Sequence, residues 1–164
     1  MNIEIKPAQT EHAELALQYY SCLLSEKLPF ILDNPIPSLD DEIKFIQQHD
    51  GEHAILFMAM HDNQVVGLSG YQIKTHHQLS HTCSLGISID KEFRGKGIGS
   101  KLISAGENWC RSKSIHRLEL EVLEDNPAIT FYHKLGFEKD GSKRDAIKVN
   151  GAFKDMIIMS KILV

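Results

Sequence analysis

The stretch "EFRGKGIGS", residues 92–100, constrains the fold most, because it separates two segments of different apolar periodicity. Upstream, "HTCSLGISID" carries apolar residues at every second position, which is typical of a strand. From Gly97 onward the apolar residues recur at helical spacing instead. The sequence therefore predicts a strand, a glycine-rich loop and a helix in succession.

The other segments extend this alternation along the whole chain. Strands are predicted over 2–6, 54–60, 64–73, 81–90 and 116–122, with two more within 145–163. Helices are predicted over 10–24, from 38 onward, from 97 onward and over 127–135. The order is strand, two helices, three strands, helix, strand, helix, two strands, which indicates a mixed α/β domain with hairpins beside one crossover unit.

Local signals support several of these boundaries. Thr10 is the expected cap of the first helix, and Ser38 with Asp41 three residues later forms a capping box for the second. Gly136 is suited to end the last helix. Asn150 and Gly151 form the strongest short hairpin signal in the chain.

Composition narrows the class of protein. With 164 residues, we expect one domain over residues 1–164, and a net charge of −4 lacks the basic excess of a nucleic-acid-binding protein. The N-terminus does not resemble a secretory signal, and the longest apolar run, "AILFMAM", is too short to span a bilayer. Three widely spaced cysteines favour buried thiols in a reducing cytoplasm. We expect neither a membrane nor a nucleic acid as partner.

The glycine loop has the chemistry of an anion site. At a helix N-terminus, free backbone N–H groups and the helix dipole converge on one point. Gly95, Gly97 and Gly99 allow the backbone to approach a phosphate and to adopt positive φ angles. Arg94, Lys96 and Lys101 add positive charge.

Three interpretations of the loop remain open on these residues alone. A dinucleotide loop is favoured by Gly95-x-Gly97 and by an acidic residue, Glu119 or Glu121, about twenty residues later, but Ser100 replaces the third glycine. A helix entry without any ligand is the second interpretation, and a site for another phosphate-bearing ligand is the third. A Walker A loop is excluded because no Gly-Lys-Ser/Thr is present.

The loop and a second motif together resemble a known family. "RGKGIG", read as Arg-x-x-Gly-x-Gly, is followed about thirty residues later by "AITFYHKLGF", and this pair resembles the GNAT superfamily of N-acetyltransferases. The resemblance implies an α/β (α+β) fold with a mixed, mostly antiparallel central sheet of about seven strands, flanked by about four helices. The expected element order is β-α-α-β-β-β-α-β-α-β-β.

The resemblance also implies acetyl-CoA as acyl-donor co-substrate and no metal. Its pantetheine arm is expected along the backbone of Ile87, Ser88 and Ile89, and its pyrophosphate on the loop. The expected contacts of the loop are Arg94, Gly95, Lys96, Gly97, Ile98, Gly99 and Ser100. Asn126 is a further expected contact, although Asp125 stands where the family usually has its asparagine.

Members of the family transfer acetyl directly to an amine, without a covalent enzyme intermediate. Tyr132 matches the family tyrosine that protonates the leaving thiolate and contacts the cofactor, and its phenol is a plausible acid because a thiol has the lower pKa. A backbone N–H at Ile89 is the expected oxyanion donor. Glu121 is the candidate base, with His81 as a weaker substitute.

The acceptor is an amine that the sequence does not identify. In the family, the first two helices and the final hairpin border the acceptor site, and a homodimer through the C-terminal strands is common. The alternative function is a catalytically silent coenzyme A binding or sensor module of the same fold. A zinc site at His77 and His81 is disfavoured, because their spacing marks a metal pair only on a helix.

Overall fold

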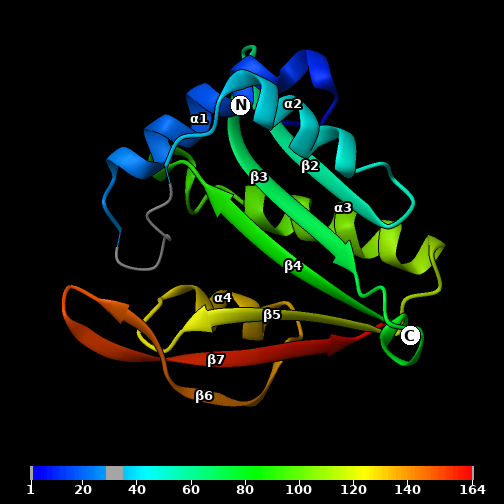
Figure 1. The fold of residues 1–164 in the computed structure, drawn as a ribbon, viewed down its shortest axis with the longest axis vertical. Helices are drawn as coiled ribbons and strands as arrows, with labels where there is room; N and C mark the ends of the chain where they lie inside the picture. Colours follow the sequence, from blue (N-terminus) through cyan, green and yellow to red (C-terminus); the bar gives the residue numbers. More distant parts are fainter. Residues whose placement is uncertain (1, 29–34, 164) are drawn as a thin grey trace.

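The computed structural model describes residues 2–28 and 35–163, whose seven strands form one sheet (Figure 1). The strands are β1 (Glu4–Pro7), β2 (Ala54–His61), β3 (Gln64–Ile73), β4 (Thr82–Ile89), β5 (Arg117–Leu123), β6 (Glu138–Val149) and β7 (Ala152–Ile162). Their order across the sheet is β1-β2-β3-β4-β5-β7-β6, and every neighbouring pair is antiparallel except β4 and β5. The predicted fold class and element order are confirmed.

Helices cover both faces of the strands β2 to β4. Helices α1 (Ala13–Ser25) and α2 (Leu39–Gln48) lie on one face, and α3 (Ile98–Ser112) lies on the other (Figure 1). The short helix α4 (Ala128–Lys134) follows β5. On β2, Met58 packs with the α1 residues Tyr19 and Leu23, whereas Phe57 belongs to the core on the α3 side. This double coverage explains why "AILFMAM" is apolar throughout instead of alternating.

Two hairpin turns join neighbouring strands, and the one predicted at Asn150 and Gly151 is confirmed. Asp62 and Asn63, between β2 and β3, have φ angles of 46° and 62°. Asn150 and Gly151, between β6 and β7, have φ angles of 49° and 84°. Two consecutive residues with positive φ form the type I′ turn, whose twist matches that of the flanking strands.

The start of α2 is also as predicted, whereas the start of α1 is not. Ser38 Oγ accepts a hydrogen bond from the Asp41 backbone N–H at 3.2 Å, so Ser38 is the N-cap of α2. The Asp41 carboxylate accepts from the Ser38 hydroxyl, at 2.7 Å, rather than from the backbone N–H that completes a capping box. Thr10 does not cap α1 and instead begins a short 3₁₀ turn, Thr10–His12, that precedes the helix. There the Gln9 backbone N–H donates to His12 Nδ1 at 2.9 Å, so a histidine ring satisfies the first amide.

Candidate functional site

Strands β4 and β5 separate after a short contact. They pair only between Thr82–Ser84 and Arg117–Glu119, and beyond these residues they diverge (Figure 1). The remainder of β4 still pairs with β3, and the remainder of β5 pairs with β7. The sheet is therefore split along one edge of β4, and the loop of residues 90–97 and the start of α4 both follow the open ends of the two strands.

The alternation of hydrogen bonds along β4 determines which backbone groups line this split. At the two ends of the β3–β4 ladder, Asp90 N donates to Val66 O and Lys74 N donates to Thr82 O, both at 3.0 Å. In an antiparallel pair, hydrogen-bonded residues alternate with residues whose N–H and C=O point away from the partner strand. The odd-numbered residues of β4, including Ile87 and Ile89, therefore turn their N–H and C=O toward the split.

The glycine loop has the backbone conformation that its sequence predicts. Gly95 and Gly97 have φ angles of 73° and 79°, in the left-handed region that favours glycine, and Gly97 is the residue before α3. A Cβ at either position would meet no atom within 4 Å, so these glycines are required by conformation and not by crowding. The first amides of α3 have no carbonyl one turn earlier, which leaves them available to a ligand.

Gly99 has a packing role in addition to the cofactor contact that the sequence predicts. A Cβ at this position would lie 2.9 Å from Phe131 Cζ, so the missing side chain allows α4 to pack against the first turn of α3. Phe131 in turn lies 5.5 Å from the ring of Tyr132, between centroids. The third glycine thus positions the motif tyrosine, by way of Phe131.

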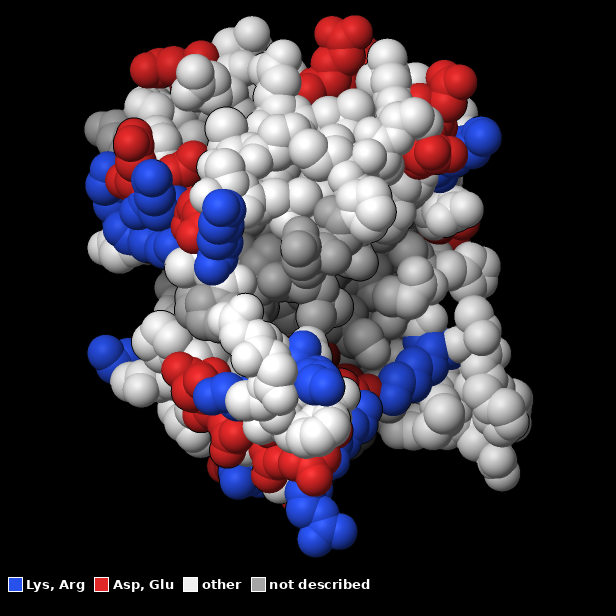
Figure 2. Space-filling model, turned by 60° about the vertical axis from the view of Figure 1, so that its left-hand side comes forward, with Lys and Arg blue, Asp and Glu red and all other residues white. Residues whose placement is uncertain are grey.

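Two of the cations near the loop, Arg94 and Lys96, contact other protein groups. Arg94 Nε donates to Ile89 O at 2.9 Å, and Arg94 Nη2 lies 2.6 Å from Glu26 Oε2 at the end of α1. Lys96 Nζ lies 5.0 Å from the centre of the Phe93 ring. Figure 2 shows Lys and Arg side chains on both sides of the indentation between the upper and lower parts of the molecule.

Tyr132 lies on α4 and is 8% exposed, with its ring 5.9 Å from that of Phe137. Burial raises the pKa of its phenol to about 12. No other described residue forms a hydrogen bond with the Tyr132 hydroxyl. At neutral pH the side chain is therefore a protonated donor without a protein acceptor.

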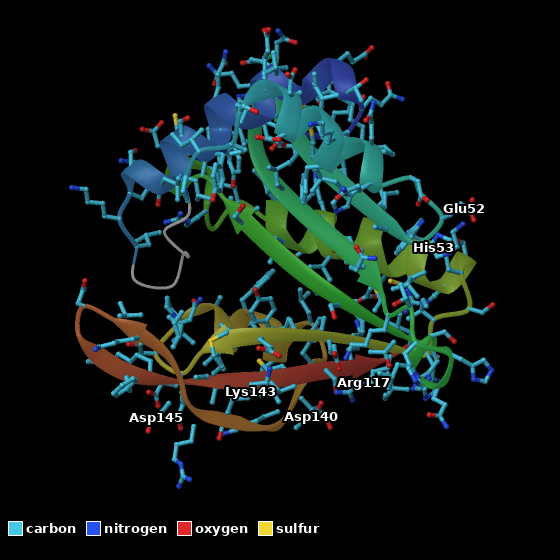
Figure 3. The ribbon with its side chains drawn as sticks, in the orientation of Figure 1. Glu52, His53, Arg117, Asp140, Lys143 and Asp145 are labelled. Carbon is cyan, nitrogen blue, oxygen red and sulfur yellow. The ribbon has the colours of Figure 1, made fainter. Side chains whose placement is uncertain are left out.

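Glu121 lies on β5, on the face opposite to the buried Leu120 and Val122. Its carboxylate forms an ion pair with Lys143 of the neighbouring hairpin (Figure 3 labels Lys143). His81, the weaker candidate base, precedes β4 at the closed end of the split, where His81 O accepts from Arg117 N at 3.0 Å. It is seven residues from Ser88, or about 23 Å along an extended strand, so it does not share a site with the glycine loop.

At the same closed end, Arg117 Nη2 lies 2.5 Å from Asp140 Oδ2, which joins β5 to the edge strand β6 (Figure 3). This hydrogen bond is the main cause of a lowered pKa of the Asp140 carboxyl. The charged residues at this end therefore hold strands together.

The two candidates for the family's asparagine contact are both bonded within the protein. Asn126 Oδ1 accepts from the Ala128 backbone N–H at 2.9 Å and so holds the start of α4. Asp125 Oδ2 lies 2.6 Å from Lys154 Nζ, and this hydrogen bond lowers the pKa of the Asp125 carboxyl. Asn126 is the residue that adjoins the helix carrying Tyr132.

A cavity of about 670 Å³ lies on the α1/α2 side of the sheet. It is bordered by α1, α2 and strands β2 to β4, and its lining includes Ile87 and Ser88. Within it, Tyr19 Oη donates to Ser88 Oγ at 2.9 Å. The apolar pattern of this helix, which predicts a buried face of Leu15, Leu17, Tyr20, Leu23 and Leu24, does not include Tyr19. In the structure the buried face of α1 is formed by Ala13, Ala16, Tyr19 and Leu23.

None of the helices in the described residues is long and apolar enough to cross a bilayer. Residues 2–28 and 35–163 also contain no group of three or more His, Cys, Asp or Glu side chains arranged to hold a metal ion.

Residues 18–137 match the family model described as Acetyltransferase (GNAT) family. A curated relative is the L-amino acid N-acetyltransferase AaaT of Escherichia coli (strain K12), which is 33% identical over 106 residues, or 62% of this chain and 64% of that protein. The chain thus spans less than two thirds of that relative, and about half of two further curated relatives.

Solved structures share the fold over nearly the whole chain. An acetyltransferase of GNAT family from Streptococcus pneumoniae superposes with a TM-score of 0.90 at 23% identity, covering 98% of this chain and 99% of that one. The yncA protein of Salmonella typhimurium, a putative acetyltransferase solved with its cofactor acetyl-CoA, superposes with a TM-score of 0.88 at 17% identity, covering 100% and 95%.

Proposed function

Because this chain belongs to the acetyltransferase (GNAT) family, we propose that it transfers an acetyl group from acetyl-CoA directly to a primary amine, without a covalent enzyme intermediate. The observation that carries this proposal is the split between β4 and β5, with a glycine loop and the start of α3 at its open end. Residues 1–164 act in this reaction as one domain in the cytoplasm.

The residues at the split fit the chemical groups of acetyl-CoA. The outward N–H and C=O of Ile87 are suited to pair with the amides of the pantetheine arm, as an added strand would. At Ile89 only the N–H is open to a ligand, because Ile89 O accepts from Arg94 Nε at 2.9 Å. Backbone N–H groups between Arg94 and Ser100 are suited to the pyrophosphate, because two left-handed glycines expose the loop amides ahead of the helix. Asn126 adjoins the same open end.

Acetyl-CoA, when bound, supplies an activated acyl group and a thiolate leaving group. Glu121 accepts the proton of the attacking amine, through a water molecule, and the Ile89 backbone N–H donates to the oxygen on which negative charge develops. Tyr132 donates its proton to the departing sulfur. This assignment is supported by the phenol itself, which is protonated at neutral pH and has no hydrogen-bond acceptor among the described residues, so its O–H is available to the departing sulfur.

The pKa of the acceptor amine determines how strongly its deprotonation depends on the base. An α-amine with a pKa near 8 is substantially deprotonated at neutral pH, whereas a lysine amine near 10.4 costs about 3 kcal/mol more to deprotonate. The Glu121 carboxylate is exposed and engaged by Lys143. A weak base would favour acceptor amines of low pKa.

The proposal is tested by calorimetric titration with acetyl-CoA, followed by thiol release with a broad panel of amines. We expect binding of acetyl-CoA and thiol release that depends on the amine. Binding without release from any amine would identify a silent coenzyme A binding module. Absence of binding would refute both functions, and a parallel NAD titration would then show whether the loop holds a dinucleotide.

The base is tested separately with Glu121→Gln, using Lys143→Met as the control that breaks the same ion pair without removing the carboxylate. We expect Glu121→Gln to lower kcat/KM about 100-fold, as loss of a general base typically does. A loss of equal size in Lys143→Met would instead assign the pair a structural role.

A further inference from the structure

The cavity on the α1/α2 side combines an apolar lining with very few polar groups. Its apolar lining includes Tyr19, Leu23, Phe45, Leu56 and Leu68. Its volume of about 670 Å³ falls within the range of small-molecule sites. Ile87 also belongs to the lining, and its backbone faces the split, so the cavity adjoins the edge of β4 where the acyl group is proposed to lie.

Part of the cavity wall on β3 and β4 carries no side chains. Gly70 of β3 and Gly86 of β4 are register partners, and both line the cavity. A Cβ on Gly86 would meet no atom within 4 Å, so the space above it is open. Two facing glycines at this point create room for a ligand beside Ser88.

Two carboxylates lie on the α2 side of the cavity, and their environments differ. Asp41 is held within its own helix start, since Ser38 Oγ donates to Asp41 Oδ2 at 2.7 Å and Lys44 Nζ lies 3.9 Å from Oδ1. Glu42 is half-buried, and no described residue forms an ion pair or a side-chain hydrogen bond with it. Desolvation raises the pKa of the Glu42 carboxyl, as expected for a carboxylate that lacks a cationic partner.

No positive side chain of the described lining balances Glu42. The described lining contains no Lys, Arg or His, and residues 29–34, which lie outside the described part, contain none in the sequence either. His49 Nε2 lies 4.0 Å from the position of a Cβ on Gly70, and its Nδ1 bonds to Phe45 O at 2.7 Å. A ligand with a carboxylate would therefore meet repulsion here, whereas an ammonium group would complement Glu42.

The cavity lies beside the first two helices, where members of the family have their acceptor site. We propose that in this chain it takes a small cationic amine that carries an apolar group and no carboxylate, with Glu42 as the carboxylate that attracts the ammonium. This inference rests on the proposed acetyl transfer. It distinguishes the chain from the L-amino acid N-acetyltransferase that it resembles, because an amino acid brings its own carboxylate into the cavity. The apolar group packs against the aromatic lining, and the amine reaches the edge of β4 over the paired glycines.

The test compares 2-phenylethylamine with L-phenylalanine, which differ by one carboxylate, by titration at pH 8, where histidine side chains are neutral. Titrations are run with and without coenzyme A, which cannot donate an acetyl group. We expect 2-phenylethylamine to bind at least about 10-fold more tightly than L-phenylalanine, a difference of about 1.4 kcal/mol. Ethylamine, which lacks the ring, should bind about 10-fold more weakly than 2-phenylethylamine.

Three variants assign the effect to this cavity. Glu42→Gln should reduce the preference for 2-phenylethylamine about 5-fold, whereas Asp40→Asn, which removes a charge from the same helical turn outside the cavity, should leave it unchanged. Gly86→Val places a side chain in the open space above this residue. It should abolish amine binding and leave acetyl-CoA affinity unchanged, because the N–H and C=O of Gly86 face β3.

The possible failures are separable. If the wild-type protein does not bind acetyl-CoA, the proposed function fails, while amine binding without coenzyme A still reports on the cavity. Equal affinity for 2-phenylethylamine and L-phenylalanine, or a preference that survives Glu42→Gln, overturns the charge argument. Binding that survives Gly86→Val places the acceptor elsewhere. Tighter binding of a short peptide with an N-terminal phenylalanine than of 2-phenylethylamine overturns the assignment of a small molecule.

Discussion

Arg94 Nη2 lies 2.6 Å from Glu26 Oε2, and this ion pair joins the glycine loop to the C-terminal end of α1. The Glu26 side chain is only 6% exposed, and its Oε1 also accepts from the Lys91 backbone N–H at 3.4 Å. The first arginine of the loop motif is thus part of the scaffold that holds the loop.

We predict that Arg94→Ala lowers the free energy of unfolding by about 1–3 kcal/mol, because it leaves a nearly buried carboxylate without its partner. The double variant Arg94→Ala with Glu26→Gln should lose less than the sum of the two single variants. Denaturant unfolding of all four proteins measures this coupling. Strictly additive losses would show that the pair contributes nothing to the loop.

Tyr132→Phe should lower kcat about 100-fold or more and leave acetyl-CoA affinity within about 2-fold, because only the proton donor is removed. Steady-state kinetics and titration measure the two quantities. The matched control is Tyr71→Phe, which removes another buried hydroxyl, one that donates to Leu102 O at 3.1 Å. An equal loss of turnover and affinity in Tyr132→Phe would assign the ring to packing.

The raised pKa of Tyr132 also predicts how stability depends on pH. Its pKa is about 12 in the folded protein against an ordinary value of 10.0, so between these values the unfolded chain binds fewer protons. The contribution of Tyr132 is complete below pH 10 and is lost as the pH rises toward 12. Urea unfolding at pH 9 to 12 should show a steeper decline for the wild type than for Tyr132→Phe. Parallel curves would contradict the burial of the phenol.

Gly97→Val and Gly99→Ala should affect different properties, the first acetyl-CoA affinity and the second stability. At Gly97 a Cβ has space but φ is 79°, so Gly97→Val strains the loop and should lower acetyl-CoA affinity more than it lowers stability. At Gly99 a Cβ meets Phe131, so Gly99→Ala should cost about 1–3 kcal/mol of stability by overpacking. Adding Phe131→Leu to Gly99→Ala should recover part of that loss, and thermal unfolding measures it.

Local sequence patterns predict some boundaries of the strands and miss others. Asn150 and Gly151 fixed the last turn correctly, but β6 begins at Glu138 and not near Asp145. The missed part of this edge strand is exposed and charged, contains Gly141 and is interrupted by two bulges, so it has no apolar alternation to detect. Its ladder depends on pairing with β7, which is not a local signal.

The functional site also has features that the sequence predicts and features that it does not. The loop conformation at Gly95 and Gly97 follows from glycine itself, and it was predicted. The split between β4 and β5 could not be predicted, because both strands carry the same alternation of apolar and polar residues whether or not they pair. Glu42 and Ser88 border one cavity although they come from distant segments, and that proximity exists only after folding.

Hydrogen exchange of the backbone amides of β4 depends on whether a ligand is bound at the open edge of this strand. Its even-numbered amides donate within the ladder to β3, whereas beyond the short pairing with β5 the amides of Ile87 and Ile89 face the open side. Deuterium should therefore enter the open part of this strand fast at these two odd positions and slowly at the even ones. A bound partner strand of amides would slow only the odd set, so isotope uptake read residue by residue can tell a filled edge from an empty one.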